Sequence, residues 1–210
     1  MAIWQYQLHI IPRKSILDKY GEIPDTLFIN KEGWKRFWKN FNGDFDNIEY
    51  GFEDAWTIKW WKNIKFDIEG TVYQIDKLIK RGNWNSAKGF IGWKGNTKNE
   101  EDHDCYISFD EETKEVKEFQ LRIDLRNGKN ANVFMTGMLD ICLQNELMVM
   151  NMEGVLFSPR AEVIFEDIKS SNATKFLTDP VGFIEKVVDN EDNKFLNLTN
   201  KEGVWKGKKK

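Results

Sequence analysis

The chain has 210 residues, a formal net charge of −3, 40% hydrophobic residues and 31% charged residues. This length buries enough apolar surface for a core that needs no disulfide or metal, and the composition is that of a folded soluble protein. No run approaches the roughly 18 apolar residues that a membrane span requires, and the net charge argues against a general nucleic-acid-binding protein.

The first twenty residues predict a strand followed by a short helix. Residues 4–11 alternate apolar and polar side chains, which is the period of a strand, and Pro12 ends it. The segment lacks the positive start and the cleavage site of a secretion signal, so we expect it to belong to the mature fold. Residues 13–20 then predict a helix that Gly21 closes.

Aromatic residues dominate the next predicted helix, over residues 31–40. Trp34, Phe37, Trp38 and Phe41 recur at helical spacing, which places them on one wide face. We expect Trp34 and Trp38 to lie in the core.

The middle of the chain mixes ambiguous and clear signals. Residues 55–70 are rich in aromatic side chains but irregular in spacing, and we interpret part of them as a strand. Residues 71–80 predict a helix. Three strands are predicted next, at 88–94, 105–110 and 116–127, and the last of them alternates almost without interruption.

The last third predicts two helices that flank two strands. A helix is expected over residues 131–146, strands within 148–158 and 161–168, and a final helix that begins near Asp179 and Pro180. An Asp cap followed by Pro at the first helical position suits a helix start.

These elements define a fold class. The strands alternate with helices but are half polar, which favours an antiparallel or mixed sheet over a doubly wound parallel one. We therefore predict a single α+β domain over residues 1–204, with an antiparallel or mixed sheet packed against several helices. Residues 205–210 are rich in lysine and predict a basic C-terminal tail.

The two cysteines bear on the compartment. Cys105 and Cys142 are far apart in sequence, in segments predicted to be strand and helix. This usage is typical of free buried thiols in a reducing environment, so we expect a cytoplasmic protein without a disulfide.

No catalytic or cofactor motif is found. The chain lacks a phosphate-binding glycine loop, G-x-S-x-G, H-E-x-x-H and C-x-x-C, so no cofactor and no metal are predicted. His9 falls on the polar face of the first strand and is interpreted as an ordinary sheet residue. His103 lies among carboxylates that could hold a hard cation, but the segment lacks the ligand spacing of a calcium loop, and we favour a loop without metal.

A hydrolase that uses two carboxylates is one alternative function. Glu53 with Asp54 beside Trp56, or Asp104 with Asp124, could form the pair of a glycosidase next to sugar-stacking aromatics. The chain has 34 carboxylate side chains, so such pairs also arise by chance.

A module that binds single-stranded nucleic acid is a second alternative. Residues 77–98 hold six basic residues and no acidic one, together with Trp84, Phe90 and Trp93. Charge and stacking aromatics are the usual means of holding a single strand. The acidic block that follows would repel the same phosphates, so we do not expect nucleic acid to be the partner.

Acidic segments give the leading hypothesis, which is a protein partner. Residues 100–118 contain nine acidic residues and two lysines, and opposite charge accelerates association with a basic partner. Tryptophan and tyrosine supply the anchors of tight interfaces. The predicted contact residues are Asp44, Asp46, Glu49, Glu53, Asp54, Glu100, Glu101, Asp102 and Asp104.

Three segments resemble the small cytoplasmic immunity proteins of bacterial polymorphic and contact-dependent toxin systems. They are WQYQLHIIPRKSILDKYGEIP, FQLRIDLRN after DHDCYISFD, and SSNATKFLTDPVGFIEKV. The resemblance is one of general style, without a shared motif, so it assigns no residue. It implies an α+β protein without catalysis that binds one cognate toxin and covers its active site.

Overall fold

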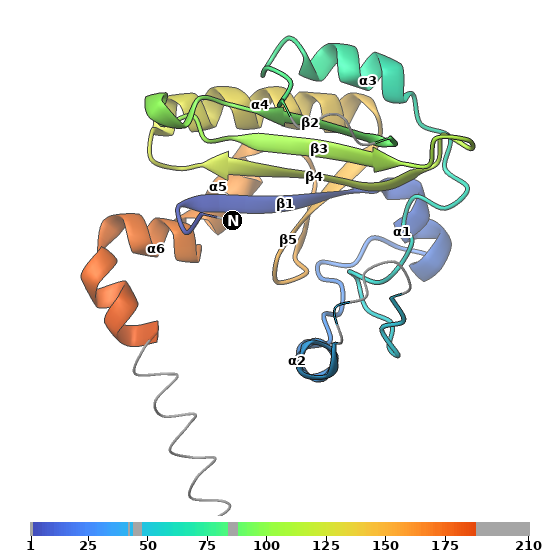
Figure 1. The fold of residues 1–210 in the computed structure, drawn as a ribbon, viewed down its shortest axis with the longest axis horizontal. Coiled ribbons are helices and arrows are strands. Elements are labelled where there is room, and N and C mark those ends of the chain that lie inside the picture. The colour runs from blue at the N-terminus through green and yellow to red at the C-terminus, as the bar shows by residue number, and fades with distance from the viewer. Residues whose placement is uncertain (1, 42, 44–47, 84–87, 188–210) are drawn as a thin grey trace, which may run out of the picture.

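The computed structural model describes residues 2–41, 43, 48–83 and 88–187, and the statements that follow refer to these residues. Six strands form an antiparallel sheet in the order β2-β3-β4-β1-β5-β6 (Figure 1). The strands are β1 (Gln5–Pro12), β2 (Phe90–Lys94), β3 (Asp104–Phe109), β4 (Val116–Asp124), β5 (Leu147–Asn151) and β6 (Leu156–Phe157). The predicted α+β class is confirmed, and the sheet is antiparallel rather than mixed.

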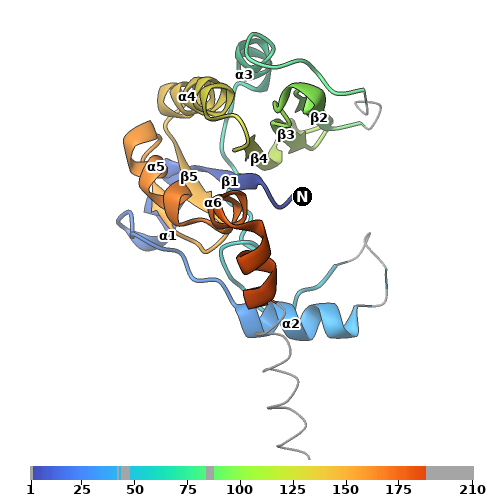
Figure 2. The same ribbon diagram turned by 90° about the vertical axis from the view of Figure 1, so that its left-hand side faces the viewer.

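The helices lie mainly on one side of this sheet. Figure 2 shows α4 and α5 along one face, with α3 beside α4, whereas α2 lies at the opposite end of the molecule. The helices are α1 (Arg13–Tyr20), α2 (Lys31–Asn40), α3 (Ile68–Ile75), α4 (Gly128–Gln144), α5 (Ala161–Ser170) and α6 (Asn172–Thr178), with a 3-10 turn η1 (Thr97–Asn99). Residues 180–187 are also helical, as predicted, and the side chain of Asp179 accepts a hydrogen bond from the backbone of Gly182. No helix among the described residues is long and apolar enough to cross a bilayer.

Local signals set the ends of the first two helices. Gly21 adopts a left-handed conformation with φ 77° and its N–H bonds to the carbonyl of Leu17, which closes α1. Before α2, the side chain of Asn30 accepts a hydrogen bond from the backbone of Gly33, as an N-cap does. Both helices have the predicted bounds.

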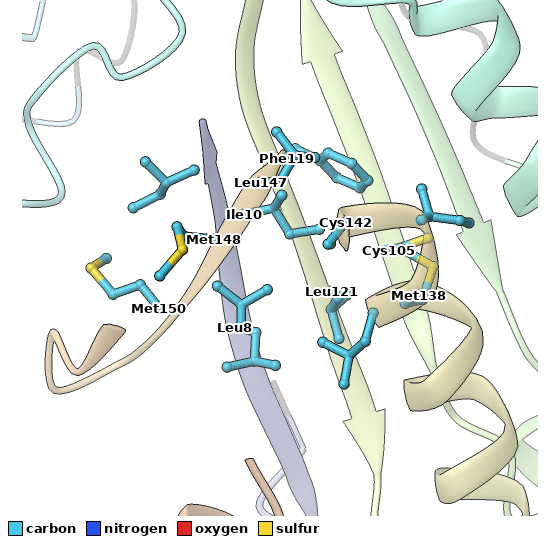
Figure 3. Packing of buried hydrophobic residues seen from close by; sticks show 14 of the residues in the cluster. Leu8, Ile10, Cys105, Phe119, Leu121, Met138, Cys142, Leu147, Met148 and Met150 are labelled. Atoms are coloured by element: carbon cyan, nitrogen blue, oxygen red, sulfur yellow. The ribbon is translucent and has the colours of Figure 1, made fainter. Parts of the chain in front are cut away.

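The core lies between the sheet and α4. Leu8 of β1 and Leu121 of β4 point toward α4, whose Met138 and Cys142 meet Cys105 of β3 (Figure 3). All five side chains are at most 1% exposed. The two cysteines are free and buried, which confirms that part of the prediction.

The other face of the sheet is divided between polar and aromatic side chains. On the β4 half, Gln7 donates to Gln120 and Arg122 donates to Asp104, both at 2.6 Å. On the β1 and β5 half, the turns at residues 48–66 pack against the sheet, and Trp56 lies with its ring 5.2 Å from that of His9. The strand pairing thus leaves a polar surface beside an aromatic one.

The prediction of a strand at 161–168 is wrong, because this segment is helix α5. Ile164 and Ile168, four residues apart, are buried, whereas Val163 and Phe165 on either side of Ile164 are 45% and 38% exposed. One face at helical spacing is therefore buried, although the β-branched content favours a strand.

The predictions for residues 55–80 are also corrected. No strand forms within 55–70: residues 55–67 make turns and irregular segments, in which the indole of Trp60 donates to the carbonyl of Ala55 at 2.7 Å, and residues 68–70 belong to α3. The helix predicted at 71–80 is α3, which begins earlier because the side chain of Asp67 caps it through Gly70, and which ends at Ile75.

Candidate functional site

Helix α2 carries a group of neighbouring aromatic side chains, of which Trp38 is exposed. Gly33 is the buried residue of this helix, whose aromatic side chains lie on one face. Trp34 is at the centre of a cluster: its ring centroid is 5.8 Å from that of Phe37, 5.1 Å from Tyr50 and 5.3 Å from Phe52. We call the residues Trp34, Phe37, Trp38, Phe41, Tyr50 and Phe52 the α2 aromatic cluster.

The cluster has an anchored side and an exposed side. The indole N–H of Trp34 donates to the Oδ2 atom of Asp54 at 2.7 Å, which fixes that ring toward the sheet. Trp38 stacks on Trp34 at 6.4 Å and is 57% exposed. The expectation that Trp38 lies in the core is therefore wrong, and Trp34 is only partly buried.

A hollow of about 500 Å³ lies beside the cluster. Phe37, Phe41 and Tyr50 line its apolar part, and Arg36 and Glu49 contribute opposite charges. A hollow with an aromatic wall and charges of both signs suits a protein side chain or a short peptide segment.

Asp54 holds this region together rather than facing solvent. It is 3% exposed, and its carboxylate accepts hydrogen bonds from the backbone of Asn30, from the indole of Trp34 and from the backbones of Trp56 and Thr57. Such a satisfied buried carboxylate is a structural element of the turn.

The other predicted residues of this segment are exposed or lie outside the described residues. Glu49 is exposed, and Glu53 is exposed and pairs with Lys19 at 2.7 Å. Asp44 and Asp46 belong to the residues that the structure does not describe.

The second predicted acidic stretch is largely an internal network. Asp102 and Asp104 are 7% and 3% exposed, and both pair with Lys94. Asp104 also binds Arg122, while the backbone of Asp102 donates to Asp124. The structure therefore brings these carboxylates together as partners of cations within the fold.

The remaining two residues of that stretch differ from each other. Glu100 is exposed and follows η1 with φ 57°. Glu101 is half-buried and accepts a hydrogen bond from the side chain of Asn130 at 3.0 Å. Glu49, Glu53 and Glu100 are thus the exposed members of the predicted set within the described residues.

The two histidines lie in different settings, and burial lowers the pKa of each. Burial lowers the pKa of His9 to about 4. Burial also lowers the pKa of His103, and this outweighs the opposite effects of Asp124 and of Glu101. His103 accepts a hydrogen bond at Nδ1 from the backbone N–H of Asp124 at 3.0 Å, which occupies its lone pair and makes it a poor general base.

The carboxylate pairs proposed for a hydrolase are engaged elsewhere. Asp124 is fully buried and binds the guanidinium of Arg126 at 2.6 Å, as Asp104 binds Arg122. In the part of the chain that the structure describes, no group of three or more His, Cys, Asp or Glu side chains could hold a metal ion.

The aromatic side chains of the basic stretch are mostly unavailable for stacking on bases. Trp93 is completely buried and donates its indole N–H to Asp76 at 2.8 Å. Phe90 is half-buried and lies 5.2 Å from Tyr106. Trp84 lies outside the described residues.

Comparison with known proteins identifies no relative. No protein family, no curated protein and no solved structure matches the chain. The structure is therefore the evidence for treating the α2 aromatic cluster and the charges beside it as a candidate site.

The position of the cluster could be predicted, but its exposure could not. The spacing of Trp34 and Trp38 gives one helical face, whereas the sequence does not show that this helix lies at the end of the molecule (Figures 1 and 2). A hollow of about 610 Å³, lined in part by His103 and Phe134, was also missed. Its signal was the strand alternation that places His103 on the same side as Cys105, toward α4.

Proposed function

We propose that this chain is a non-enzymatic protein-binding protein, an immunity-type inhibitor that binds a cognate bacterial toxin domain in the cytoplasm. The observation that carries the proposal is Trp38, which is 57% exposed and stacks on Trp34, whose indole is held by Asp54. A large exposed aromatic side chain of this kind is typical of an interface anchor.

The cluster is organised before a partner arrives. Trp38 stacks on Trp34, and Trp34 is fixed through Asp54. Little side-chain entropy would then be lost on binding, which favours affinity for a given contact area.

The charges around the cluster specify the partner's surface. Lys35, Arg36 and Lys39 are exposed on α2, and Glu49 and Glu53 are exposed on the turns beside it. The partner should therefore present an apolar projection for the hollow, carboxylates opposite α2, and cations opposite the two glutamates. The cations of a toxin that binds phosphates would meet the last of these three requirements.

The experiment is a binding titration against the toxin domain encoded beside this chain in its genome. Trp38→Ala is expected to raise the Kd by about 30-fold or more, the loss typical of an interface hot spot. Tyr73→Ala is the matched control, because Tyr73 is 65% exposed on α3, away from α2. Protection of cells that express the toxin should fail with the first variant and persist with the second.

Two outcomes would contradict the proposal. If the wild-type chain does not bind that domain, the proposal that its partner is the toxin is refuted. If the wild type and Trp38→Ala bind with the same Kd, the proposal that the α2 aromatic cluster forms the interface is refuted. Glu49→Gln and Glu53→Gln should slow association at low salt and have less effect at high salt.

A further inference from the structure

A hollow of about 360 Å³ lies where the polar side chains of the sheet meet the turns at residues 48–66. Strands, turns and α2 all contribute to its lining, which includes His9, Ser108, Glu118, Trp34, Tyr50 and Trp56. We call it the sheet-face hollow. Its volume is near the lower end of the roughly 300–1,000 Å³ that is typical of small-molecule sites.

The strands supply the polar wall of the sheet-face hollow. Ser108 of β3 and Glu118 of β4 are paired neighbours, and the Nδ1 atom of His9 lies 3.8 Å from Oε1 of Glu118. These side chains reach solvent, since that of His9 is 17% exposed and that of Glu118 is 45% exposed. The hydroxyl of Tyr106 donates to Oε2 of Glu118. Within the described residues, Oε1 of Glu118 and the hydroxyl of Ser108 make no hydrogen bond, so both are available to a ligand.

Aromatic side chains supply the second wall. Trp34, Tyr50 and Trp56 are half-buried, and the ring centroid of Trp34 lies 5.1 Å from that of Tyr50 and 6.1 Å from that of Trp56. Asp54 fixes this wall, because its carboxylate accepts the indole N–H of Trp34 at 2.7 Å and the backbone N–H of Trp56 at 2.9 Å. The apolar wall is therefore in place before a ligand binds.

The charges of the lining favour a neutral ligand. Among the described lining residues, Glu118 is acidic and Lys117 is basic. Lys117 is 61% exposed and lies 3.4 Å from Asp110. Burial lowers the pKa of His9 to about 4, so its imidazole adds no charge at neutral pH. With charges of both signs in the lining, a neutral ligand that forms several hydrogen bonds fits better than an ion does.

A sugar ring has the two kinds of surface that the walls require. Its hydroxyls donate to a carboxylate and both donate to and accept from a hydroxyl or an imidazole. Its C–H groups form an apolar face that packs against an aromatic ring, and these weak contacts add to the burial of that face.

We propose that the sheet-face hollow binds a neutral pyranose sugar. Glu118 and Ser108 form hydrogen bonds with its hydroxyls, and the aromatic wall packs against its C–H face. Trp34 and Tyr50 also belong to the α2 aromatic cluster, whereas Trp38 is not among the residues that line this hollow. Sugar binding does not depend on a toxin as the partner, so the two activities can be measured separately.

The test is an NMR titration of the isotope-labelled chain with methyl β-D-glucopyranoside, methyl β-D-galactopyranoside and N-acetyl-D-glucosamine. We expect the side-chain signals of His9 to shift saturably with at least one of these sugars, with a Kd below about 10 mM. The chain has two histidines, and His103 does not line this hollow, so its signals should not move. Cyclohexanol has a ring of similar size but one hydroxyl, and should bind at least about tenfold more weakly.

Variants of the polar wall test its contribution. Glu118→Gln keeps the shape of the side chain but removes the charged acceptor, and should weaken sugar binding by about three- to tenfold. Glu112→Gln is the matched control, because Glu112 is exposed in the turn between β3 and β4 and does not line the hollow. Ser108→Ala removes one atom and should weaken binding by about two- to fivefold.

Trp38→Ala separates this proposal from the proposed function. The variant should bind the sugar like the wild type and lose affinity for the toxin domain, so the failure of either proposal leaves the other to its own measurement.

Three results would overturn the proposal. The first is that none of the three sugars saturates the His9 signals below about 50 mM. The second is that cyclohexanol binds as tightly as the best sugar, because the hollow would then be an unspecific apolar surface. The third is that Glu118→Gln and Ser108→Ala bind that sugar as tightly as Glu112→Gln does.

Discussion

Acidification should destabilise this fold through His9. The ring of His9 lies 5.2 Å from that of Trp56, and burial lowers its pKa from 6.5 to about 4. Glu118 lies 3.8 Å from Nδ1 and would favour the charged ring, but it is 45% exposed and already accepts the hydroxyl of Tyr106 at 2.6 Å. Burial therefore decides the direction.

The sign and size of the effect follow from proton linkage. The unfolded chain takes up a proton at His9 near its ordinary pKa of 6.5, whereas the folded chain does so only near 4. The stabilisation is complete above about pH 6.5 and is lost as the pH falls toward 4. Between pH 7 and pH 5 the free energy of unfolding should fall by about 2 kcal/mol from this residue alone.

Urea denaturation at a series of pH values measures this loss. In His9→Gln the part of the pH dependence that comes from His9 should disappear, while the smaller part from His103, whose pKa is also lowered, should remain. An unchanged slope between about pH 7 and pH 5 in His9→Gln would show that the imidazole is hydrated in solution and would refute the assignment.

Three further predictions concern the core and its buried groups. Leu121→Ala, at a position 1% exposed, should lower the free energy of unfolding by about 2–5 kcal/mol in urea denaturation; a loss of a few tenths would contradict the packing against α4. Asp124→Asn removes the carboxylate that binds Arg126 and should lower the free energy of unfolding by about 3–5 kcal/mol. Burial raises the pKa of Asp124, but its hydrogen bonds lower it by more. Acidification should therefore reduce the stability of this variant less than that of the wild type. The thiols of Cys105 and Cys142, whose pKa values burial raises, should react with a thiol reagent only at the rate of unfolding; fast labelling of the native chain would contradict this.

Short-range chemistry explains which elements could be predicted. Helices α1 and α2 have the predicted bounds because Gly21 and Asn30 act within a few residues of the helix ends. Strand β4 was predicted from alternation alone, since Phe119, Leu121 and Ile123 point into one core. These signals do not depend on the rest of the fold.

Tertiary contacts explain the errors. Residues 161–168 have β-branched side chains, but Ile164 and Ile168 pack beside α4 and so select a helix. In residues 55–66 the indoles of Trp56 and Trp60 pack against the sheet from turns, a position that aromatic content cannot predict.

The same limit applies to the candidate sites. A run of acidic residues in a sequence suggests side chains that are exposed to solvent. Asp102 and Asp104 are nevertheless buried, because Lys94 and Arg122 from neighbouring strands form ion pairs with them. The sequence gives the carboxylates and the cations but not their register. The exposure of Trp38 depends in the same way on where α2 lies.

The place of β1 in the sheet also bears on how the chain is made. This strand is synthesised before the other five, but its neighbours are β4 and β5, so that Pro12 pairs with Leu147. At roughly 5–20 residues per second, synthesis needs on the order of ten to thirty seconds to reach the second partner. During this time both edges of β1 lack their native neighbours, and the central sheet can close only after β5 has been translated.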